Sequence, residues 1–100
     1  MEGNIVMEEN ITNEIQQAVD IISQYASKNW SEMGVNFSLN EKVIDAYITV
    51  DDDEYSIGFD DDDNEKLTSL FLLISAKHEE ICEYISLEFD NEGNYTISFE

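Results

Sequence analysis

Apolar residues recur every three or four positions in the first quarter of the chain. The stripe consists of Ile11, Ile15, Val19, Ile22 and Ala26, with Ala18 beside them. Polar residues fill the positions between, as they do on the outer face of a helix with 3.6 residues per turn. The pattern predicts an amphipathic helix over about residues 8 to 28, and Asn10 directly precedes its apolar stripe.

The period of the pattern then changes to two. Three segments alternate between apolar and polar residues: 33–39, 44–50 and 55–59. Such alternation is typical of strands that bury one face. Short polar turns at residues 40–42 and 51–53 separate the segments, so the sequence predicts a meander of three strands.

Helical spacing returns in the second half of the chain. The second stripe consists of Leu67, Leu70, Phe71, Ile74 and His78. Asp63 or Asn64 is placed to cap the first turn of this helix, where carboxylates also suit the positive end of the helix dipole. Two further alternating segments, 85–89 and 95–99, flank a polar turn at residues 90–93 and predict a closing hairpin.

The predicted order of elements is helix, three-strand meander, helix and hairpin. Each strand has polar alternate positions, as expected for an antiparallel sheet with one face packed under helices. One hundred residues are enough for one domain, and no repeat or linker divides the chain. We therefore expect a single α+β domain over residues 1–100, with a mainly antiparallel sheet packed against helices.

The charge of the chain narrows the classes of partner. It has 24 Asp and Glu residues, four Lys and no Arg, which gives a net charge of -20. Nucleic acids and anionic membranes are bound through Lys and Arg, so neither is an expected partner. Because 42% of the residues are hydrophobic, the chain should fold rather than remain a disordered acidic tail. A charged partner should therefore be basic.

The residues that report on compartment point to the cytoplasm. The first residues show neither the basic segment nor the apolar segment of a signal peptide. No apolar run approaches the ~20 residues of a membrane span. Cys82 is the only cysteine, which rules out an internal disulfide and fits a reducing compartment.

Few residues offer catalytic chemistry. His78, the only histidine, lies at the edge of an apolar stripe, where a packed or partly exposed imidazole is favoured over a general base. Cys82 has no basic neighbour in sequence that would activate it, so it is expected to pack as a small apolar side chain. The sequence contains no glycine-rich phosphate loop, metal-ligand cluster or nucleophile motif. We predict a protein that is not an enzyme and that uses no cofactor or metal.

Two acidic runs flank the third predicted strand, and residues 51 to 65 hold nine of the 24 carboxylates. Lying at opposite ends of that strand, the runs should be ~15 Å apart at ~3.4 Å per residue. Neither has the ligand spacing of an EF-hand loop, which needs glycine at position 6 and glutamate at position 12. Helix capping accounts for one or two carboxylates. For the remaining carboxylates four explanations stay open: cation binding, phosphate mimicry, contact with a basic partner, or a solvated loop.

The whole pattern resembles a known family. The first helix, the segment NWSEMGVNFSL with Trp30, the acidic meander, the second helix and the hairpin YISLEFDNEGNYTISFE are similar to YezG-like bacterial immunity proteins over about residues 10 to 99. The family commonly has a proline and acidic residues before the tryptophan, where this chain has Ser27, Lys28 and Asn29, and Tyr84 replaces a second tryptophan. Trp30 itself is expected to close the junction between helix and sheet.

The resemblance implies an antitoxin of a polymorphic toxin or contact-dependent growth inhibition system. It would bind a cognate secreted nuclease domain, with a ribonuclease among the candidates, and cover its basic active site. The alternative is an acidic DNA mimic or adaptor that binds a basic host protein. The expected contact residues are Asp51, Asp52, Asp53, Glu54, Tyr55, Asp60, Asp61, Asp62 and Asp63. The last strand leaves an edge open for pairing, so the oligomeric state stays undetermined at this point.

Overall fold

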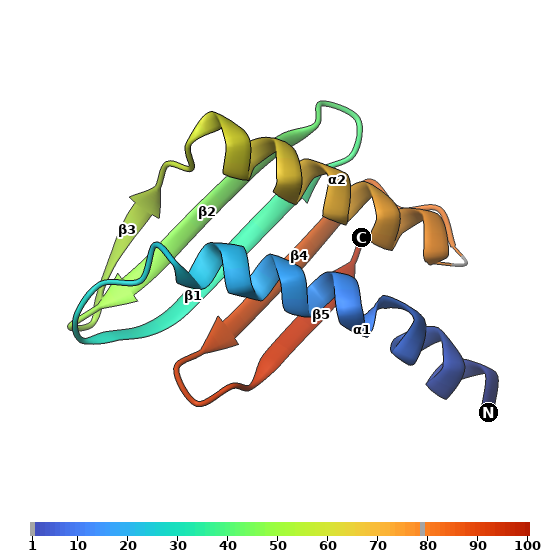
Figure 1. The fold of residues 1–100 in the computed structure, drawn as a ribbon, viewed down its shortest axis with the longest axis horizontal. Coiled ribbons are helices and arrows are strands. Elements are labelled where there is room, and N and C mark those ends of the chain that lie inside the picture. Colours follow the sequence, from blue (N-terminus) through green and yellow to red (C-terminus); the bar gives the residue numbers. More distant parts are fainter. Residues whose placement is uncertain (1, 79) are drawn as a thin grey trace.

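The computed structural model describes the backbone of residues 2–78 and 80–100 and the side chains of residues 11–78 and 80–100. Helices α1 (Glu2–Ser23) and α2 (Asp61–Lys77) cover one face of a five-stranded antiparallel sheet (Figure 1). The strands are β1 (Trp30–Ser38), β2 (Val43–Val50), β3 (Asp53–Ile57), β4 (Tyr84–Asp90) and β5 (Tyr95–Phe99). The predicted α+β class and the predicted order of elements are confirmed.

The strands lie in the order β3-β2-β1-β4-β5. Neighbours in sequence pair on each side of the sheet, whereas the central strand β1 pairs with β4, which follows α2 in the chain. Helix α2 therefore returns the chain from the β3 edge to the other half of the sheet. It lies beside α1 and runs in the opposite direction across the same face (Figure 1).

The core lies between this helical layer and the sheet. Its buried strand residues occupy alternate positions, so that Val35 of β1 is directly opposite Leu87 of β4. The rings of Phe37 and Phe71 stack between β1 and α2 with their centroids 5.4 Å apart. Each such fully buried side chain stabilises the fold by roughly 1.5–3 kcal/mol relative to exposure. Most residues of the two predicted helical stripes lie in this core; Val19 and Ala26 pack against it while partly buried, and His78 lies outside it.

Helix α1 differs from the prediction at both ends. It begins well before Asn10 and ends at Ser23, whereas the sequence predicted residues 8 to 28. After Ser23 the chain tightens into a final turn, in which Tyr25 N–H donates to Ile22 O at 3.0 Å. The apolar stripe predicted too late an end for the helix, because Ala26 packs against the core although it lies beyond the last residue of α1.

Trp30 begins β1 and occupies the edge of the core, as predicted. Its ring packs edge to face against Phe89, with centroids 6.0 Å apart. The Trp30 carbonyl also accepts a hydrogen bond from the Asn91 side chain at 2.9 Å, which ties the start of β1 to the turn between β4 and β5. That turn follows Asp90 and contains Gly93 at φ 94°, and it confirms the predicted closing hairpin.

The turn between β2 and β3 is shorter than predicted. Asp51 and Asp52 have φ angles of 51° and 70°, and Val50 pairs directly with Asp53. Positive φ at both central residues is the geometry of a type I′ hairpin turn, which short polar side chains tolerate better than most. Strand β3 consequently spans Asp53–Ile57 instead of the expected 55–59.

An ion pair joins the two helices. Lys77 Nζ lies 2.9 Å from Glu14 Oε2, and the Glu14 side chain is only 13% exposed. The hydrogen bond from Lys77 lowers the pKa of Glu14, so the carboxylate is charged at neutral pH. Its other oxygen, Oε1, is buried and accepts no hydrogen bond from the described residues.

We expect Asp52→Gly to stabilise the protein by about 0.5–1 kcal/mol, because glycine adopts positive φ without the steric cost that a Cβ brings. The urea midpoint of unfolding measures the change. Asp53→Gly is the matched control: it removes the same charge from an extended residue of β3 and should destabilise the strand. Stabilisation by both variants would contradict the turn explanation and indicate relief of charge repulsion.

We expect Glu14→Gln to lower the free energy of unfolding at neutral pH by roughly 0.5–1 kcal/mol. Because folding lowers the pKa of Glu14 below its ordinary 4.5, this stabilisation is fully present above 4.5 and is lost as the pH falls through the folded-state pKa. Urea unfolding of parent and variant should therefore converge at acidic pH. Glu41→Gln, at an exposed position, removes the same charge and should cost nothing at either pH.

Candidate acidic binding surface

The second acidic run forms the start of α2. Asp60 is the N-cap: its backbone is extended, and its Oδ1 accepts a hydrogen bond from Asp63 N–H at 2.8 Å. The prediction that Asp63 or Asn64 caps the helix was wrong, because α2 already begins at Asp61. The next three aspartates fill its first turn, where the helix dipole favours negative charge.

Tyr25 connects this run to the end of α1. Its hydroxyl donates to Asp63 Oδ2 at 2.7 Å and accepts from Asp60 N–H at 3.1 Å. The hydrogen bond to Asp63 raises the pKa of Tyr25. The tyrosine ring also packs edge to face on Phe59, with centroids 4.9 Å apart. Asp60 and Asp63 therefore have structural roles, whereas Asp61 and Asp62 are exposed.

The first acidic run lies at the other end of β3, as the sequence predicted (Figure 1). Asp51 and Asp52 form the turn, and Asp53 begins the strand. Glu54 and Tyr55 are both exposed but lie on opposite faces of the sheet, because successive side chains of a strand alternate. Tyr55 shares the helix-covered face with its partner Ile48. The nine predicted contact residues thus do not form one surface.

The face of the sheet opposite the helices, which we call the open face, gathers carboxylates from different strands. Cross-strand neighbours form one row from β3 to β1: Glu54, Thr49 and Glu32. The next row runs from β3 to β5: Ser56, Tyr47, Gly34, Glu88 and Thr96. Glu32, Glu54 and Glu88 are exposed. None of the four lysines belongs to a strand, so no lysine lies within these rows.

Tyr47 is the centre of this group. A Cβ added at Gly34 would lie 2.2 Å from Tyr47 Cε1, so the ring occupies the space that a larger residue would fill. Its hydroxyl donates to Glu88 Oε2 at 2.9 Å. Burial, this hydrogen bond and the charges of Glu32, Glu88 and Glu54 all raise the pKa of Tyr47, which keeps the phenol neutral.

The open face becomes apolar toward its other end. Val43 and Tyr84 are 46% and 47% exposed, and both pair with Ser38 from opposite sides. Alternation places them on the same face as Tyr47. One uncovered surface therefore carries an acidic group around Tyr47 at one end and two exposed apolar side chains at the other, with the exposed Asp45 between them. Tyrosine is among the residues that are enriched at the centre of protein–protein interfaces.

Sequence reasoning included Glu54 among the contact residues but missed Glu32, Tyr47 and Glu88. The available signal was Gly34 inside an alternating segment, since glycine in a strand often marks a close approach by another group. Which group approaches depends on register, and β4 lies about fifty residues away in sequence from β1. The partners of Gly34 could not be read from local pattern.

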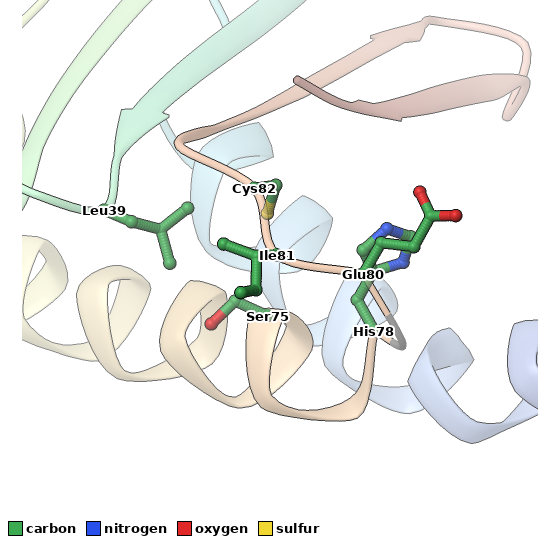
Figure 2. Close-up of a pocket in the computed structure, with 6 residues that line it drawn as sticks. All are labelled: Leu39, Ser75, His78, Glu80, Ile81 and Cys82. Atoms are coloured by element: carbon green, nitrogen blue, oxygen red, sulfur yellow. The ribbon is translucent and has the colours of Figure 1, made fainter.

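A separate hollow lies between the end of α2 and the start of β4. Figure 2 shows its lining residues, Leu39, Ser75, His78, Glu80, Ile81 and Cys82. The His78 ring stacks on Phe99 with centroids 3.8 Å apart, which confirms the predicted packed histidine. Burial raises the pKa of the Cys82 thiol, so the thiol stays protonated at neutral pH. These contacts supply no activated nucleophile.

Two further findings concern the part of the chain that the structure describes. It contains no group of three or more His, Cys, Asp or Glu side chains placed to hold a metal ion. None of its helices combines the length and the apolar character that crossing a membrane requires.

We expect Asp60→Ala to destabilise the protein by about 1 kcal/mol, because the variant removes the N-cap of α2. Asp62→Ala is the matched control, since it removes the same charge from an exposed position in the same turn and should cost only a few tenths of a kcal/mol. Thermal or urea unfolding measures both. Equal losses would contradict the capping role and assign the effect to the helix dipole.

Comparisons with known proteins identify no relative of this chain. A scan against protein-family models gives no match, and a search of curated proteins gives none either. The resemblance to YezG-like immunity proteins therefore rests on the sequence pattern alone.

Proposed function

We propose that the protein is a cytoplasmic immunity protein that binds the nuclease domain of a cognate secreted toxin and covers its basic active site. The observation that carries this proposal is a net charge of -20 without a single arginine, on a chain that nevertheless builds a full apolar core. A nuclease must neutralise phosphates with basic residues, so its substrate cleft is complementary to such a surface.

The physical role of the charge is steering. Opposite charges on the two partners raise association rates to on the order of 10⁸–10⁹ M⁻¹s⁻¹ at low salt. Rapid capture suits a protein that must block a toxin before the toxin reaches nucleic acid. Blocking by binding requires no catalytic residue, cofactor or metal from the inhibitor.

The arrangement of the carboxylates favours a defined protein partner over general phosphate mimicry. A DNA mimic is expected to space its charges along an elongated face. On the open face they gather around Tyr47, and Val43 and Tyr84 provide apolar contact area toward the other end of the same face. Interfaces between proteins combine these features, with aromatic residues enriched at their centre.

We expect the protein to protect bacteria from a nuclease toxin domain encoded directly beside its gene. Cells that express the toxin domain alone should stop growing, and co-expression of this protein should restore growth through a stable complex that copurifies. A catalytically inactive toxin domain is the control, and it should bind without affecting growth. Failure to protect, together with retention of a repressor or nucleoid protein from lysate, would favour the acidic adaptor instead.

A further inference from the structure

The molecule presents two acidic surfaces that could meet a basic partner. One is the start of α2, where Asp60 and Asp63 are already bonded to the backbone and to Tyr25. The other is the open face, which no element of the described chain covers (Figure 1). The surfaces lie on different layers of the fold, so one partner surface is not expected to contact both closely.

We propose that the open face, centred on Tyr47 and the carboxylates of Glu32, Glu54 and Glu88, is the surface that receives arginine side chains of the toxin's nuclease domain. This inference rests on the function proposed above and names the residues that perform it. The occupant is a folded basic protein surface, because the face offers both carboxylates and exposed apolar groups.

The chemistry of the acidic end suits arginine. A guanidinium donates hydrogen bonds to carboxylates in pairs and also stacks on aromatic rings, whereas an ammonium group forms only point contacts. The Tyr47 ring occupies the space where a Cβ of residue 34 would lie, among the charges of Glu32, Glu54 and Glu88, and an aromatic ring attracts a cation. Glu88 fixes the ring through its hydrogen bond at 2.9 Å, and Glu32 lies on the neighbouring strand.

The spacing of these carboxylates suits more than one basic side chain. Glu54 on β3 and Glu32 on β1 are separated by β2, so their backbone positions are about 10 Å apart at ~4.8 Å per strand. That separation accommodates two guanidinium groups without forcing them together. Val43 and Tyr84 lie about 20 Å further along the strands, where they extend the contact with apolar area.

The other exposed features of the molecule offer weaker evidence for a binding site. The hollow around Ile81 and Cys82 is lined by both polar and apolar residues, and nothing in the structure indicates what covers it. Asp61 and Asp62 are exposed, but they adjoin no exposed aromatic side chain on α2. They contribute to the long-range field and not to a shaped contact.

A charge-matched pair of double variants tests the assignment. Glu32→Gln/Glu54→Gln and Asp61→Asn/Asp62→Asn each remove two exposed carboxylates, so both proteins carry a net charge of -18 (-20 plus 2). Binding to the catalytically inactive toxin domain from the protection experiment is measured by stopped flow at two salt concentrations. Circular dichroism and urea unfolding establish that both variants fold like the parent.

We expect the open-face pair to weaken binding at least about tenfold, mainly through faster dissociation, because close contacts act on the dissociation rate. The α2 pair should change the association rate less than about threefold and only at low salt, because remote charge acts on encounter. If the α2 pair weakens binding more, or if the two pairs weaken it equally, the open-face assignment is overturned while the proposed function stands.

A probe that does not depend on a toxin separates the two proposals. A hexa-arginine peptide is titrated into isotopically labelled protein, and the amide chemical shifts are followed by NMR. Shifts centred on Glu32, Tyr47 and Glu54 support the open face even if no neighbouring nuclease is neutralised. Shifts confined to the start of α2 overturn it.

Discussion

The pairing of β1 with β4 is the constraint on which the rest of the structure depends. It joins the meander to the closing hairpin, so that five strands share one sheet with a single continuous apolar face. A face that wide needs more than one helix to remove it from water, and α1 and α2 lie together across it. Both helices are used on that side, which leaves the opposite face uncovered.

Much of the charge in the two acidic runs is explained by backbone geometry. Asp51 and Asp52 occupy left-handed turn positions, and Asp60 caps a helix. Asp90 acts similarly in the last turn, where hydrogen bonds from Asn94 and Glu92 lower its pKa. Short carboxylate side chains perform these local roles well, because they reach nearby backbone N–H groups. Runs of aspartate are therefore weak indicators of a binding site.

Two carboxylates of the open face have no such local explanation. Glu32 and Glu54 are exposed on separate strands, and their charge increases the self-repulsion of an already highly acidic chain. The hydrogen bond between Tyr47 and Glu88 holds an aromatic ring against Gly34 in their midst. Relief of repulsion by a basic partner gives this arrangement a physical rationale, and it complements the proposed inhibition of a nuclease.

The sequence by itself determined the periodic elements, because the stripe of a helix and the alternation of a strand are set by residues close together in the chain. The order of elements, the closing hairpin and the packed His78 all follow from such local pattern. Tertiary structure decided where α1 ends, which aspartate caps α2 and which residues surround Tyr47. Those outcomes depend on strand register and on helix packing between segments far apart in sequence, and no local periodicity encodes them.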